Sequence, residues 1–222
     1  GDYFKAAVYV YGANHGQFNT TWGRVDLRAS LWFLNRGQIM PYDHQETVAK
    51  VFISSFLEVT MHDRREYELL FENPLYGQNW LPTSVYLSQY QSSDSQIVCS
   101  FQEDLNLETT TMSGGRLTGV NLTTWREEPL TLGNGRLRDT ISVHLGWNHA
   151  EKGVANYSLH FPGGLVFKES NVLTFALANA SDSQEPIDFT IRIVDREGQQ
   201  ASLPLSHIMP LPPTLKYRMF KP

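Results

Sequence analysis

One histidine, His15, lies between two glycines, Gly12 and Gly16, directly after an apolar and β-prone run at residues 4–11. The imidazole has an ordinary pKa near neutrality, so a histidine on such a loop is suited to accept a proton and give it back. Ligands and catalytic groups gather at strand ends in α/β folds. The alternative is an ordinary loop histidine, because a single residue is a weak motif.

The neighbours of His15 favour the catalytic interpretation. The run Gly-Ala-Asn-His-Gly-Gln-Phe-Asn at residues 12–19 resembles the histidine loop after the last strand of α/β-hydrolases, in particular their dienelactone-hydrolase-like and acyl-hydrolase branch. The resemblance extends through the next helix, to about Glu72. It implies that His15 is the base of a Ser–His–acid triad. It also implies that Asn14 and Gln17 shape the loop and contact the substrate.

The chain departs from the family in one large respect. A hydrolase of this kind has its triad in the order Ser, then Asp or Glu, then His. Here His15 comes almost first, and no G-x-S-x-G motif occurs in the 222 residues. We therefore expect the chain to be the C-terminal part of a Ser-dependent ester hydrolase whose N-terminal segment supplies the nucleophile, the acid and most of the parallel sheet. By itself the chain is expected to be inactive on small-molecule esters.

Two elements must position His15. The apolar run at residues 4–11 predicts a buried strand. A helix is predicted over residues 46–60, where Asp43 and Glu46 form a candidate capping box and the apolar residues recur at helical spacing, namely Val48, Val51, Phe52, Phe56 and Val59. Residues 1–80 are predicted to be a β-α fragment of a hydrolase domain. Both elements should expose apolar surface unless another chain covers it.

The period of the sequence changes beyond residue 80. Apolar and polar residues alternate over residues 141–147, 155–161, 173–177 and 187–193, with turn signals between these runs. This pattern predicts an antiparallel β-sandwich over residues 81–222, so the fold class is mainly β with a small α/β part. Residues 97–104 and 189–205 resemble jelly-roll modules of the galactose-binding type. A carbohydrate-binding or purely structural jelly-roll without catalysis is therefore the alternative function.

The predicted sandwich carries two further candidate sites. Trp125, beside Arg126, is predicted to be exposed and to contact a glycan by stacking on a sugar ring; the alternative for such an aromatic residue is the core. The acidic stretch could offer oxygen ligands to Ca²⁺ and could equally be a solvated loop; its residues are Glu103, Asp104, Asn106 and Glu108. We assign no metal site and no cofactor.

Composition narrows the remaining function classes. The net charge of −5 and the pI of about 5.8 argue against a nucleic-acid partner, which would require a basic face. No apolar run approaches the roughly 20 residues of a membrane span. The single cysteine, Cys99, excludes an internal disulfide and is expected to be a buried thiol. The sequence leaves the location open and favours a secreted or periplasmic one.

Overall fold

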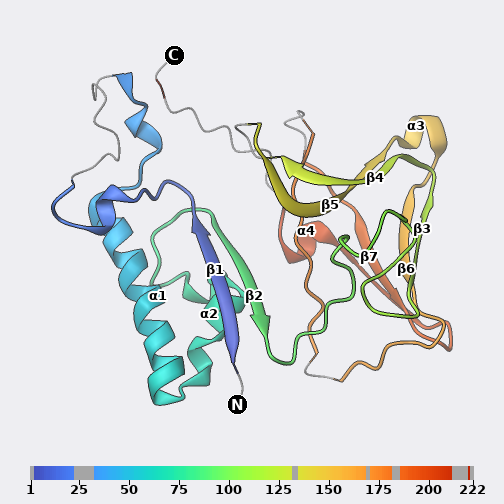
Figure 1. Cartoon of the computed structure of the whole chain (residues 1–222), viewed down its shortest axis with the longest axis horizontal. Coiled ribbons are helices and arrows are strands. Elements are labelled where there is room, and N and C mark those ends of the chain that lie inside the picture. Colours follow the sequence, from blue (N-terminus) through green and yellow to red (C-terminus); the bar gives the residue numbers. More distant parts are fainter. Residues whose placement is uncertain are drawn as a thin grey trace. The chain divides into compact units, whose positions relative to one another are not determined.

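The computed structural model describes residues 3–22, 33–131, 135–168, 171–181, 186–211 and 220. The chain divides into two compact units, one of residues 1–95 with 215–222 and the other of residues 96–214 (Figure 1). All strand pairs among the described residues are antiparallel, and helices are few. The fold is therefore mainly antiparallel β, as predicted. No helix in the described ranges is both long and apolar enough to cross a membrane.

The strands are β1 (Phe4–Val10), β2 (Tyr86–Ser92), β3 (Arg116–Val120), β4 (Leu122–Thr131), β5 (Leu137–Trp147), β6 (Asn156–His160), β7 (Thr190–Val194) and β8 (Gln200–Pro204). The α-helices are α1 (Tyr42–His62), α2 (Leu69–Glu72), α3 (His149–Lys152) and α4 (Leu205–Ile208). Short 3₁₀ turns are η1 (Gly16–Phe18), η3 (Arg36–Gln38), η4 (Arg65–Tyr67) and η5 (Pro74–Gly77).

The first unit is built on a two-stranded sheet. β1 pairs antiparallel with β2 over seven residues, from Phe4 opposite Ser92 to Val10 opposite Tyr86. The boundary predicted near residue 80 is therefore misplaced, because β2 was assigned to the sandwich and belongs with β1. The backbone groups of β1 need a hydrogen-bonding partner, and residues 86–92 supply it. Among the described strands, β2 is the only neighbour of β1.

Helices α1 and α2 cover one face of this sheet. The Phe4 ring of β1 lies 6.0 Å from the Phe56 ring of α1 and 5.4 Å from the Phe71 ring of α2. Behind these rings is the buried core of the unit, which consists of Met40, Val48, Leu70 and Leu81. Packing of this apolar stripe holds α1 against the sheet.

Parts of β1 and α1 still expose apolar surface. Tyr9 on the outer face of β1 is exposed, so the prediction of a buried strand is wrong for this chain. Along α1 the exposed apolar side chains are Ile53, Phe56, Leu57 and Met61, the last 71% exposed. This confirms the prediction that both elements expose apolar surface.

The start of α1 differs from the predicted capping box. The helix begins at Tyr42 after Pro41, and no side chain caps its first turn. A proline fits here because it has no amide hydrogen to donate and its φ is fixed near helical values. Glu46 instead forms an ion pair with Lys50, with 3.3 Å between Oε1 and Nζ. The helix ends at His62, and the next residue, Asp63, has left-handed backbone angles.

The described residues of the second unit form three two-stranded antiparallel sheets, β3–β6, β4–β5 and β7–β8 (Figure 1). The predicted strands at residues 141–147, 155–161 and 187–193 correspond to β5, β6 and β7, with shifted ends. The predicted strand at residues 173–177 is wrong, because that stretch has no strand pairing and its side chains are exposed.

Candidate active-site loop

The loop that carries His15 begins with a turn that only glycine accommodates easily. Gly12 has a φ of +80°, and a Cβ atom there would lie 2.8 Å from the backbone oxygen of Gln38. The Gly12 carbonyl accepts a hydrogen bond of 2.7 Å from the Met40 amide. The loop is therefore fixed at its start to the segment that precedes α1.

Asn14, the residue before His15, is bonded through its backbone to α1. Its amide donates to Oε1 of Gln45 at 3.0 Å, and its carbonyl accepts from Nε2 of the same side chain. Its own Oδ1 accepts a bond of 3.1 Å from the Gln17 amide. These bonds fix the backbone on both sides of His15.

Two buried glutamines hold the loop from below. Gln17 is 2% exposed and Gln45 is fully buried. Nε2 of Gln17 donates to the Met40 carbonyl at 2.8 Å and to Oε1 of Gln45 at 3.2 Å. Oε1 of Gln17 is buried without a hydrogen-bond partner among the described residues. The bonds that the two amides do make would be costly to break in a buried site, so the pair favours one loop conformation.

His15 lies beside this network in the chain. It is exposed, has helical backbone angles (φ −66°, ψ −40°) and immediately precedes η1. Its ring meets the Trp22 ring edge-on, with 4.7 Å between centroids and 74° between planes. The loop therefore presents an accessible imidazole from a backbone that is held in place.

Gln17 and Asn14, the other predicted site residues of this loop, are less exposed than His15. Gln17 is buried, so its amide positions the loop, and the prediction that it contacts substrate is not supported by its place. Asn14 is half-buried, and its contact with substrate stays a prediction. Sequence reasoning missed Gln45. Its signal was a glutamine three residues before Val48, on the apolar face of a predicted helix.

Trp125 of β4 is not the exposed platform that the sequence predicted. It is half-buried, and its indole Nε1 is buried without a hydrogen-bond partner among the described residues. The ring packs over Gly119, where a Cβ atom would lie 2.8 Å from Cε3 of Trp125, and meets the Tyr157 ring edge-on at 5.9 Å. Trp125 is a packing residue between β3, β4 and β6.

Several oxygens of the acidic stretch accept bonds within the stretch or from nearby residues, whereas Oε1 of Glu103 is buried without a hydrogen-bond partner among the described residues. Oδ1 of Asp104 accepts from the Asn106 amide at 2.7 Å, and Oδ1 of Asn106 accepts from the Glu108 amide at 3.2 Å. Glu108 also forms an ion pair with Arg116, with 2.6 Å between Oε2 and Nη2. Oε2 of Glu103 accepts from the Ser100 hydroxyl at 3.0 Å. No cluster of three or more metal-binding side chains occurs in the described part of the chain.

Cys99 lies near two of the carboxylates of this unit. Burial, together with the negative charges of Glu103 and Glu127, raises the pKa of its thiol to about 11. Burial also raises the pKa of the Tyr157 hydroxyl. Since the thiolate is the reactive form, Cys99 is unreactive near neutral pH.

We compared the chain with protein family models, curated proteins and solved structures. None of them matches it.

Proposed function

We propose that this chain supplies the general base of a serine-dependent ester hydrolase, with His15 as that base. The serine nucleophile and the triad acid are contributed by sequence outside these 222 residues. The serine oxygen attacks the acyl carbon of the ester while its proton passes to His15. The protonated imidazole then gives that proton to the departing alcohol. In the second half of the reaction, a water molecule gives a proton to His15 and attacks the acyl-enzyme. The acid is released, and the proton returns from His15 to the serine oxygen.

The observation that carries this proposal is the contrast between His15 and its neighbours. The imidazole is exposed, whereas Gly16, Gln17 and Gln45 around it are buried. A general base must be accessible and must also be held within hydrogen-bond reach of the group it deprotonates. A loop histidine without a role in catalysis has no need of two buried amides to fix its backbone.

The uncovered surfaces of the first unit support the same proposal. An α/β-hydrolase buries its last strand and the following helix in a larger sheet. β1 has a free edge among the described strands, and α1 exposes a row of apolar side chains. Such contiguous apolar surface marks an interaction site on most proteins. We propose that the remainder of the hydrolase domain covers it.

For the second unit we propose a jelly-roll β-sandwich appended to the hydrolase. The three antiparallel strand pairs support this arrangement. The partial burial of Trp125 removes the feature that favoured glycan binding by this unit, so a structural role is the version we retain.

Labelling with a fluorophosphonate probe tests the proposed function. The probe reacts with serines that an adjacent base activates, so we expect it to label the longer protein that contains this chain and not the isolated chain. The variant His15→Gln of the longer protein should be labelled much more slowly, while His44→Gln, which changes an exposed histidine of α1, should react normally. Equal labelling of the two variants would contradict the proposal.

A further inference from the structure

The hydrogen bonds of the two buried glutamines act on the backbone around His15. Those of Gln17 and Gln45 end on main-chain atoms of Asn14 and Met40 and on each other. They therefore do not set the side-chain torsions of His15. Exposed side chains change rotamer within nanoseconds, whereas a general base has to be held within reach of the proton that it accepts. A base in this loop therefore needs a further contact that orients its ring.

Trp22 makes a contact of this kind. Its indole ring meets the imidazole of His15 edge-on, with 4.7 Å between the ring centroids and 74° between the ring planes. Aromatic rings prefer such edge-to-face arrangements at centroid distances of about 4.5–7 Å, and the attraction depends on their mutual orientation. Rotation of the imidazole into another rotamer breaks the contact. The indole therefore favours one orientation of the His15 side chain.

Asn19 holds Trp22 in place. Oδ1 of Asn19 accepts a hydrogen bond of 2.9 Å from the Thr21 amide and one of 2.8 Å from the Trp22 amide. Asparagine side chains stabilise turns in this way. The Asn19 amide in turn donates to the Gly16 carbonyl at 3.4 Å across η1, which begins directly after His15. The backbone of Trp22 is thus bonded to the same short loop that carries the imidazole.

We propose that Trp22 is a positioning residue for His15. The indole keeps the imidazole in one orientation, and the side chain of Asn19 keeps the indole beside it. The catalytic part of this inference rests on the proposed function, whereas the orientation of His15 by Trp22 does not. In catalysis Trp22 acts through His15, because without the contact the imidazole spends less time oriented to accept the serine proton. The rate of the chemical step then falls, and substrate binding is little changed.

NMR on the 222-residue chain tests the orientation of His15. We expect nuclear Overhauser effects between the C–H protons of the imidazole and the indole protons of Trp22. The three-bond couplings between Hα and the two Hβ protons of His15 should report a single χ1 rotamer. In Trp22→Ala these couplings should average over the rotamers. Trp22→Phe should keep most of the parent pattern, because a phenyl ring also packs edge-on. The amide spectrum of each variant establishes that it folds.

Two variants of Asn19 test whether its side chain holds the indole. Asn19→Ala removes both bonds to the amides of Thr21 and Trp22, so the Overhauser effects between the two rings should weaken about twofold or more. Asn19→Asp retains an acceptor oxygen at the same position and should leave these effects near the parent intensity. Equal intensities in the two variants would show that the turn at Asn19 does not hold the indole.

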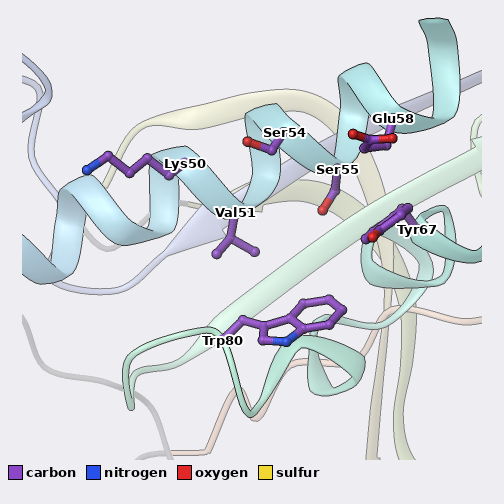
Figure 2. A pocket seen from close by; sticks show the side chains of 7 residues that line it. All are labelled: Lys50, Val51, Ser54, Ser55, Glu58, Tyr67 and Trp80. Carbon is purple, nitrogen blue, oxygen red and sulfur yellow. The ribbon is translucent and has the colours of Figure 1, made fainter. Parts of the chain in front are cut away.

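Trp80→Ala is the matched control for the loss of an exposed indole in the same unit. Trp80 is 53% exposed, against 59% for Trp22, and its ring lies opposite α1 and beside Tyr67 (Figure 2). This variant should leave the couplings of His15 unchanged. The proposal is overturned if the parent chain shows no Overhauser effect between the two rings, or if Trp22→Ala leaves the couplings at their parent values. It is also overturned if Trp80→Ala averages them to the same extent.

Kinetics on the longer protein that the proposed function requires test the catalytic part. Trp22→Ala should lower kcat for p-nitrophenyl esters by about 10-fold to 100-fold and leave KM within about twofold, and Trp22→Phe should recover most of the rate. If His15→Gln lowers kcat and Trp22→Ala does not, the positioning role is wrong while the proposed function stands. If neither variant lowers kcat, the proposed function is contradicted, and the catalytic role of Trp22 falls with it.

Discussion

Replacing Gln45 with leucine tests whether the buried amides hold the His15 loop. The substitution preserves most of the side-chain volume and removes every polar atom. It deletes three hydrogen bonds, two to the backbone of Asn14 and one to Nε2 of Gln17. The Gln17 side chain keeps its bond to the Met40 carbonyl.

The expected loss is about 3 kcal/mol. Each intramolecular hydrogen bond contributes about 1 kcal/mol net, and the three are lost together. The cost rises toward 5 kcal/mol if the Asn14 amide and carbonyl stay buried without partners, because each unpaired group costs about 1–3 kcal/mol. If the loop instead opens to water, the loss of stability stays near 3 kcal/mol, and the loop no longer has a single conformation. In both cases the backbone next to His15 is released.

Amide hydrogen exchange reports this release directly. A loss of about 3 kcal/mol corresponds to exchange about 100-fold faster at the Asn14 amide. The control is His44→Leu, an exposed neighbour on the same helix, which should change local stability by less than about 0.5 kcal/mol. If Gln45→Leu leaves the exchange rate of Asn14 within threefold of the parent, about the effect of 0.7 kcal/mol, our account of the loop is incorrect.

Two further predictions concern backbone and charge. Gly12→Ala should destabilise the first unit by about 2–4 kcal/mol, because the new Cβ meets the Gln38 carbonyl and alanine disfavours positive φ. The control Gly37→Ala should be nearly neutral. Equal midpoints of urea unfolding for the two variants would refute this prediction. Iodoacetamide should alkylate Cys99 with a midpoint near pH 11 in the folded chain and near 9.0 in urea. The stabilisation that goes with the neutral thiol is complete below pH 9 and is lost as the pH rises through 11. Glu127→Gln should lower the alkylation midpoint of the folded chain. An unchanged midpoint in that variant would exclude the Glu127 carboxylate as a cause of the raised pKa.

The local elements of the first unit were largely predictable. The apolar run at residues 4–11 gave β1, and the helical spacing of Val48, Phe52 and Val59 gave α1, because both patterns follow from which face each element buries. The sequence also predicted that His15 lies in the loop that follows this strand. The exposed apolar surface was predictable because one strand and one helix cannot cover all of each other's apolar side chains.

Long-range partners were not predictable in the same way. Nothing in residues 84–92 alone indicates that β2 pairs with β1 rather than with a later strand, because pairing depends on the whole fold. Gln45 was overlooked because a polar residue on a helix is normally assigned to the solvent side. Trp125 was judged by its charged neighbours in sequence, although alternate residues of a strand point to opposite faces.

The activity of the His15→Ala variant tests the central claim most directly. The measurement is kcat/KM for p-nitrophenyl esters, made on the longer protein that the proposed function requires, with circular dichroism to establish that the variant folds. The account predicts a loss of about three to six orders of magnitude, since triad residues act as a unit. Turnover by a folded His15→Ala protein at the parent rate would show that His15 is an ordinary loop residue, and the proposed function would be contradicted.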